Sequence, residues 1–137
     1  MADEICRVEY FYVIVPDKPG KAAQILEGLR DAGVNLLAFS GFPKGKKGQL
    51  DLVASDTAAL MEAAKKLKLD LSKKKTGFHI QADDRPGAVA EIMGKLAAAK
   101  INVVAMQAIS AGAGRFGGLL WVKTGDLKKA AKALGVA

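Results

Sequence analysis

Two four-residue stretches combine the residue types of a small-molecule site. They are Asp17-Lys18-Pro19-Gly20 and Asp84-Arg85-Pro86-Gly87, and each lies between an apolar run and a stretch with helical periodicity. We call each stretch an elbow. The N–H groups at a helix start carry the positive end of the helix dipole and can bind an anion. The carboxylate just before them can face a cation, so an elbow suits a zwitterion.

This chemistry assigns contacts to a bound zwitterion. At the first elbow, the ligand carboxylate would accept hydrogen bonds from the N–H groups of Gly20 and Lys21. The ligand ammonium would face Asp17. The corresponding groups at the second elbow belong to Gly87, Ala88 and Asp84.

A structural interpretation of the same residues stays open. Proline fits the first position of a helix, and a neighbouring glycine lets other groups approach the backbone closely. The aspartate could cap the helix. Asn35 and Asn102 follow the predicted helices, where each could favour a turn into the next strand or orient a ligand. The presence of two copies favours neither interpretation, since both copies could be structural.

The elbows belong to an internal repeat, in which position 17 corresponds to position 84. The same register holds without a gap from the first apolar run to the last helical stretch. Matching pairs include Phe11 and Phe78, Ile25 and Ile92, Leu29 and Leu96, and Leu60 and Leu127. We therefore predict two units, residues 1–72 and residues 73–137.

The first unit has the pattern of a βαββαβ fold. Runs rich in β-branched and aromatic residues predict strands, and apolar residues at i, i+3, i+4 and i+7 predict helices. The predicted elements are strand 8–15, a helix from Pro19 with Gly33 as its cap, strands 34–42 and 49–55, helix 57–67 and strand 69–72. This order predicts an α+β, ferredoxin-like unit with an antiparallel sheet and both helices on one face.

The second unit repeats this order but lacks a clear fourth strand. Its predicted elements are strand 77–82, helix 86–100, strands 101–110 and 119–123, and helix 126–134. Lys100 stands where the first unit has Gly33. Because a left-handed lysine costs about 1–2 kcal/mol, we expect this helix to end differently.

The missing strand predicts self-association. Strand 77–82 would lack a neighbour on one side, and an unpaired strand edge is a template for another chain. The sheet face with Tyr10, Tyr12 and Ile14 is also too apolar to leave wet. We therefore predict a homodimer. The alternative is that segment 3–7 covers the gap within one chain.

These features resemble the ACT domain, a βαββαβ ligand-binding module of regulated enzymes in amino-acid metabolism. The resemblance covers nearly the whole chain and is carried by the elbow, the following helix, and Val34-Asn35 or Ile101-Asn102 at the start of the next strand. It implies that an effector, commonly an amino acid, binds between paired units and exerts allosteric regulation.

The resemblance also implies which residues form the site. At the first copy they are Asp17, Lys18, Pro19, Gly20 and Asn35, and at the second copy they are Asp84, Arg85, Pro86, Gly87 and Asn102. Some members of the family have a histidine two residues before the acid. This chain has Val15 and Ala82 at those positions, so the resemblance does not identify the ligand.

Composition restricts the cellular setting. The 137 residues include 21 Lys and Arg against 14 Asp and Glu, a net charge of +7, and the lysine clumps are typical of solvated surface. Cys6 is the single cysteine, so no intramolecular disulfide can form, which favours a cytoplasmic protein. No apolar stretch is long enough for a membrane span, and the first residues lack the pattern of a signal peptide.

The sequence contains no constellation typical of an enzyme. His79 is the single histidine, and no second ligand type converges with it, so we expect no metal and no cofactor. It alternates with core positions and should lie on the sheet face away from the helices.

RNA binding is the main alternative, since the RNA-recognition module has the same element order. Tyr10 and Tyr12 lie on the first strand, and an aromatic-containing run covers residues 115–122. These aromatic residues are split between the units, however, so neither unit has a full stacking pair. We therefore predict a non-enzymatic sensor that binds an amino acid and passes the signal to a protein partner.

Overall fold

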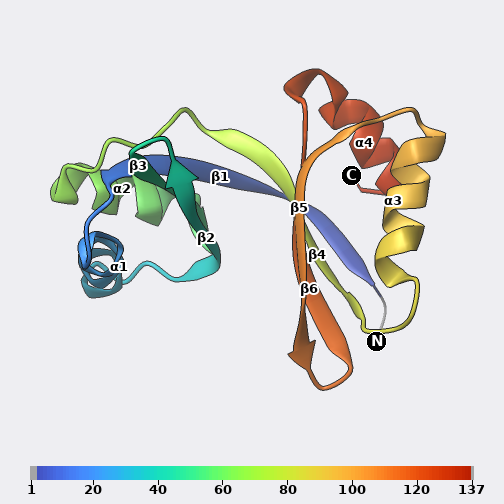
Figure 1. Ribbon diagram of the computed structural model, residues 1–137, viewed down its shortest axis with the longest axis horizontal. Coiled ribbons are helices and arrows are strands. Elements are labelled where there is room, and N and C mark those ends of the chain that lie inside the picture. The colour runs from blue at the N-terminus through green and yellow to red at the C-terminus, as the bar shows by residue number, and fades with distance from the viewer. Residues whose placement is uncertain (1–2, 137) are drawn as a thin grey trace. The chain divides into compact units, whose positions relative to one another are not determined.

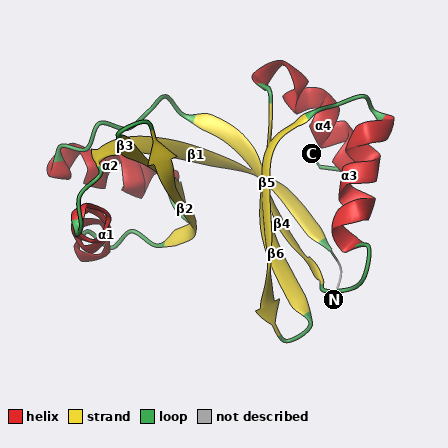
Figure 2. Cartoon of the chain, in the orientation of Figure 1, coloured by secondary structure: helices red, strands yellow, loops and turns green. Residues whose placement is uncertain are grey.

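The computed structural model describes residues 3–136, and these residues form two compact units. Unit I is Glu9–Lys75. Unit II combines the chain up to Val8 with the chain from Thr76 onward. Each unit has helices and an antiparallel sheet, so the predicted α+β class is confirmed (Figures 1 and 2).

Unit I contains a three-stranded sheet with two helices on one face. Its elements are β1 (Glu4–Pro16, from Glu9), α1 (Lys21–Asp31), β2 (Leu36–Lys44), β3 (Lys47–Ala54) and α2 (Thr57–Leu67). The strand order is β2-β3-β1, with antiparallel neighbours. Phe11, Val13 and Val15 alternate along β1 and are buried with Leu29 of α1 and Leu60 of α2. The predicted bounds of α2 are confirmed.

Unit II has a four-stranded sheet in the order β1-β4-β6-β5. Its further elements are β4 (Lys75–Asp83), α3 (Ala88–Ala98), β5 (Val103–Gly112), β6 (Arg115–Val122), a short 3-10 helix (Thr124–Asp126) and α4 (Leu127–Leu134). Helices α3 and α4 cover one face of these strands (Figure 1). Phe78 and Ile80 face the helices and are fully buried, so His79 between them lies on the opposite face, as predicted.

The fourth strand of unit II is the beginning of β1, which pairs with β4. Ile5 packs against the core of this unit, and Asp3 lies beside the end of β4. The predicted open edge of strand 77–82 is therefore wrong, and the alternative, cover by segment 3–7 of the same chain, is confirmed. The predicted division near residues 72 and 73 lies close to the observed one after Lys75, but the chain up to Val8 joins unit II.

The predicted strand 69–72 does not form in unit I. The N–H of Ser72 donates to the carbonyl of Tyr12 at 2.9 Å, and the N–H of Tyr12 donates to Oγ of Ser72 at 2.9 Å. Leu69 and Leu71 pack against the core. The segment thus lies beside β1 where a fourth strand would, without a ladder of backbone hydrogen bonds.

Helices α1 and α3 end alike, which overturns the prediction for Lys100. Gly33 has φ 79°, and the N–H of Val34 donates to the carbonyl of Leu29 at 2.9 Å. Lys100 has φ 59°, and the N–H of Ile101 donates to the carbonyl of Leu96 at 3.0 Å. Both are Schellman caps. The lysine adopts the left-handed conformation because the following hydrophobic residue is held in the core.

Candidate functional site

Each elbow is a type II turn. At the first elbow the N–H of Lys21 donates to the carbonyl of Lys18 at 3.3 Å. Gly20 has φ 87° and ψ −10°, the values of the third residue of this turn. Pro19 supplies the fixed φ of the second residue.

The second elbow has the same geometry. The N–H of Ala88 donates to the carbonyl of Arg85 at 3.2 Å, and Gly87 has φ 82° and ψ 1°. No heavy atom lies within 4 Å of the place where a Cβ on Gly87 would be. The glycine is therefore required by its positive φ and not by close approach of another group.

These turns correct the predicted structural roles of proline and aspartate. Helices α1 and α3 begin at Lys21 and Ala88, so each proline precedes its helix instead of starting it. The N-cap residue of each is the glycine, which has no side chain to cap with, so the aspartate is not the cap residue. The turn also engages the N–H groups of Lys21 and Ala88. An anion at α3 would then meet the N–H groups of the next residues of the first turn.

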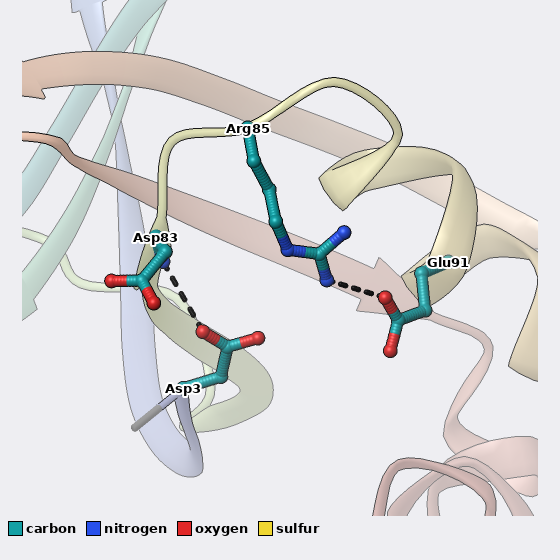
Figure 3. A network of polar contacts seen from close by, with 4 residues as sticks. All are labelled: Asp3, Asp83, Arg85 and Glu91. Carbon is teal, nitrogen blue, oxygen red and sulfur yellow. Dashed lines mark hydrogen bonds and ion pairs between the residues drawn. The ribbon is translucent and has the colours of Figure 1, made fainter. Parts of the chain in front are cut away.

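Charged side chains surround the second elbow, as Figure 3 shows. Arg85 forms an ion pair with Glu91, which lies in the first turn of α3. The Oδ1 atom of Asp3 accepts a hydrogen bond from the N–H of Asp83 at 3.2 Å. Nη1 of Arg115 lies 2.7 Å from Oδ1 of Asp83. The β4–α3 connection is thereby linked to the start of β1, to β6 and to α3.

The pKa values of two of these groups respond to their partners. The hydrogen bond from Arg115 holds the pKa of Asp83 below its usual value. The hydrogen bond to Glu91 raises the pKa of Arg85. Asp83 and Arg85 therefore stay ionised at neutral pH, with the Arg85 guanidinium directed to Glu91 of α3.

A pocket of about 360 Å³ opens beside the second elbow. Asp84, Arg85 and Gly87 line it from the elbow, together with Ala88, Val89 and Ala90 of α3, Ala108, Ile109 and Ser110 of β5, and Phe116 of β6. The N–H of Asp84 donates to the carbonyl of Gly114 at 2.9 Å and ties the elbow to the β5–β6 turn. The pocket thus joins an acidic residue, a helix start and an apolar wall.

The first elbow has a plainer environment. Asp17, Lys18, Pro19 and Gly20 are all exposed, and Lys21 is partly exposed at the start of α1. The repeat thus places the predicted residues alike at both elbows, whereas the charged network surrounds the second.

One unit does not bring the predicted asparagines to the elbow. Asn102 follows the C-terminal end of α3, whose 11 residues span about 16 Å at 1.5 Å each. Asn35 occupies the same place after α1, where its carbonyl accepts a hydrogen bond from the N–H of Ser55 at 2.9 Å. The elbow and the asparagine of one unit thus cannot contact the same ligand.

Sequence reasoning missed four members of the charged network. Asp83 and Glu91 flank the second elbow, and their absence from the first copy was a readable signal. Asp3 and Arg115 are distant in sequence, and only the placement of β1 and β6 beside β4 brings them to the elbow.

Other chemistries find little support among the described residues. No group of three or more His, Cys, Asp and Glu side chains in residues 3–136 could hold a metal ion. Trp121 and Phe116 of β6 are buried, so neither offers a face for base stacking. No helix in the described part of the chain is long and apolar enough to cross a membrane.

Solved structures with the same architecture include several regulatory proteins. Protein BT0572 from Bacteroides thetaiotaomicron matches with a TM-score of 0.82 at 19% identity, over 94% of this chain and 87% of that one. The ligand-free regulatory subunit of aspartate kinase from Thermus thermophilus matches with a TM-score of 0.65 at 13% identity, over 98% and 95%. The corresponding subunit from Thermus flavus gives 0.57 at 14% identity, over 98% and 94%.

These matches show the fold. The predicted resemblance to the ACT fold is confirmed. No protein-family model matches the chain, and no curated protein matches it by sequence.

Proposed function

We propose that this chain is a non-enzymatic regulatory protein that binds an amino acid at the second elbow. The pocket beside Asp84 and Gly87 carries the proposal, because it joins a carboxylate to a helix start. The ligand ammonium faces Asp84, and the ligand carboxylate lies at the first turn of α3. The apolar wall formed by Ala108, Ile109 and Phe116 receives the side chain.

A second copy of the chain completes the site. β5 is an edge strand without a charged residue, and its Val104 and Ile109 are 60% and 76% exposed. Natural edges of this kind are usually protected by charge or covered. We therefore propose a homodimer in which two β5 strands pair about a two-fold axis.

Such pairing would let Asn102 take part in ligand binding, as the sequence predicts. Two β5 strands related by a two-fold axis run antiparallel, so the beginning of one lies beside the end of the other. The partner subunit's Asn102 then approaches the pocket wall at Ile109 and Ser110. Its amide can orient the ligand by donating and accepting hydrogen bonds.

Two points support the regulatory role, namely the fold and the lack of a catalytic acid–base pair at the elbow. Two of the matched structures are regulatory subunits of aspartate kinase. The elbow binds and orients a zwitterion but pairs no acid with a base at a reacting atom. We propose that the ligand changes the dimer, that the dimer passes this change to a protein partner, and that the protein works in the cytoplasm.

A thermal-shift screen against the twenty amino acids tests the proposal. A ligand at 100 times its dissociation constant adds about 2.7 kcal/mol of stability, which is an easily measured shift. Light scattering should give a mass near twice 14.3 kDa, with or without ligand. If no amino acid or related metabolite raises the midpoint, the sensor is rejected, and a clean monomer rejects the proposed dimer.

A further inference from the structure

Two lysines from stretches that are separate in the sequence meet on one face of unit I. This open face is the side of β2, β3 and β1 away from the helices. The Nζ atoms of Lys44 and Lys75 lie 5.5 and 5.4 Å from the ring centroid of Tyr12. Their neighbours in the two stretches are Lys46 and Lys47, and Lys73 and Lys74. The fold thus brings one lysine from each stretch to the same aromatic ring.

Nearby acids balance only part of this charge. Lys74 pairs with Glu9 at 2.8 Å on the helix side of β1, so this pair does not belong to the open face. Asp51 lies directly across from Tyr12 in the sheet, and Nε2 of Gln49 donates a hydrogen bond to its Oδ1 at 2.9 Å. Asp51 is buried, and this burial raises its pKa. With Lys44, Lys47 and Lys75 against the buried Asp51, the exposed part of this face remains positive.

An exposed apolar pair borders these lysines. Ile14 and Phe42 lie in one row across the sheet, on either side of Gln49. They are 39% and 45% exposed. Lys44 and Lys47 form the next row of the same face. An apolar centre with a charged rim is the usual anatomy of a protein–protein interface.

The aromatic residues argue against nucleic acid as the occupant. Binding of single strands uses free aromatic faces on which bases stack. The ring of Tyr12 has an ammonium group of Lys44 and one of Lys75 close to it, so it is not free for a base. Of the rings of Tyr12 and Phe42, only that of Phe42 offers an exposed aromatic face. A carboxylate-rich segment fits both the lysines and the apolar pair.

We propose that the open face of unit I binds an acidic segment of a partner protein. An apolar side chain of that segment packs between Ile14 and Phe42, and flanking carboxylates face Lys44 and Lys75. This surface lies in a different unit from the second elbow and uses none of its residues. Its test is therefore independent of amino-acid binding.

Fluorescence anisotropy with a labelled peptide tests the proposal. The probe is a fluorescein-labelled peptide in which a leucine is flanked on both sides by glutamates. The full chain should bind it, and Lys44→Gln with Lys75→Gln should weaken binding roughly tenfold, since exposed ion pairs contribute up to about 1 kcal/mol each. Lys128→Gln with Lys129→Gln, on α4 of unit II, removes the same charge and should leave affinity within about twofold of the unchanged chain.

Further measurements distinguish an acidic peptide from a neutral peptide and from nucleic acid as the ligand of this face. Phe42→Ser should weaken peptide binding without loss of the thermal midpoint, since this side chain is exposed. A peptide with glutamine in place of glutamate should not bind. The proposal is overturned by absent binding, by equal losses in both lysine pairs, or by an oligothymidylate that binds more tightly than the peptide at the same salt concentration.

Discussion

The two elbows share one type II turn and differ in the charges around it. Both have proline before a glycine of positive φ, 87° in the first and 82° in the second. The second is surrounded by ionised side chains, whereas the corresponding positions of the first are uncharged. These pairs, with the first copy named first, are Pro16 and Asp83, Gln24 and Glu91, and Gly48 and Arg115.

This difference separates the two roles that the sequence left open. What the copies share, the Pro-Gly turn and the start of the helix, is sufficient to form the elbow. What only the second copy has, the ion pairs and the tie from Asp84 to Gly114, fixes the position of one particular elbow. Rigid placement of polar groups reduces the cost of ordering a site on binding. The comparison therefore points to the second elbow as the binding copy.

The largest expected effect tests whether the two units contribute equally to the free energy of unfolding. Leu29 and Leu96 occupy corresponding positions in α1 and α3, and each is 1% exposed. Replacing either by alanine should cost about 2–5 kcal/mol of unfolding free energy, measured in urea. Met61→Ala, at a half-exposed position of α2, should cost much less.

Hydrogen exchange should locate each loss in its own unit. Leu29→Ala should increase exchange in unit I and Leu96→Ala in unit II. Equal increases in both units for either variant would show that the two copies do not behave as separate units.

The second largest expected effect is a difference in ligand affinity between variants of the two elbows. Asp84→Ala removes a charge-assisted contact to the ligand ammonium worth about 1.5–3 kcal/mol, so affinity should fall at least tenfold in isothermal titration. Asp17→Ala is the matched control at the first elbow and should change affinity by less than about twofold, the effect of an exposed residue without the contact. Equal losses would make both elbows binding sites, and no loss in either variant or in the double variant would leave both aspartates structural.

The helix ends allow a smaller, reciprocal test. Unit I ends α1 with Gly33 and α2 with Lys68, whereas unit II ends α3 with Lys100 and α4 with Gly135, and all four residues have positive φ. Lys68→Gly and Lys100→Gly should each stabilise the chain by up to about 1 kcal/mol, because glycine adopts this conformation without strain. Gly33→Lys should have the opposite effect. Thermal unfolding measures both, and stabilisation by Gly33→Lys would contradict backbone strain as the cause.

Local patterns predicted most elements because each depends on nearby residues. The alternation of Phe11, Val13 and Val15 identified β1, and the apolar spacing on α2 gave both of its ends. The elbow was also predicted, since Pro-Gly is a local signal, although as the first helical turn instead of a type II turn. Local patterns could not tell that the left-handed strain of Lys100 would be tolerated, because the burial of Ile101 fixes that turn.

Long-range placement was beyond these patterns. The open edge of β4 predicted that something must cover it, but no local pattern in residues 4–8 could decide between this segment and a second chain, since β4 lies some 70 residues later. The same placement brings Asp3 to the second elbow. The lysines over Tyr12 were likewise invisible as a cluster, since Lys44 and Lys75 are adjacent only through the sheet.

The smallest expected effect compares one ion pair from each unit as pH falls. Arg115 holds the pKa of Asp83 below its ordinary value of 3.8, and Lys74 holds the pKa of Glu9 below 4.5. A carboxylate with a lowered folded-state pKa stabilises the protein above its ordinary pKa, and this contribution is lost as pH falls through the lowered value. Asp83→Asn should therefore lower the thermal midpoint near neutral pH, and the difference from the unchanged chain should vanish in strong acid.

Glu9→Gln is the matched variant in unit I and should show the same trend with a smaller amplitude. The side chain of Arg115 is 18% exposed, whereas that of Lys74 is 56% exposed, so solvent and salt screen the Lys74–Glu9 pair more strongly. Midpoints measured from neutral pH down to strong acid compare the two variants. A larger effect for Glu9→Gln, or a difference for Asp83→Asn that grows on acidification, would remove the reason for treating the second elbow as the one held by charge.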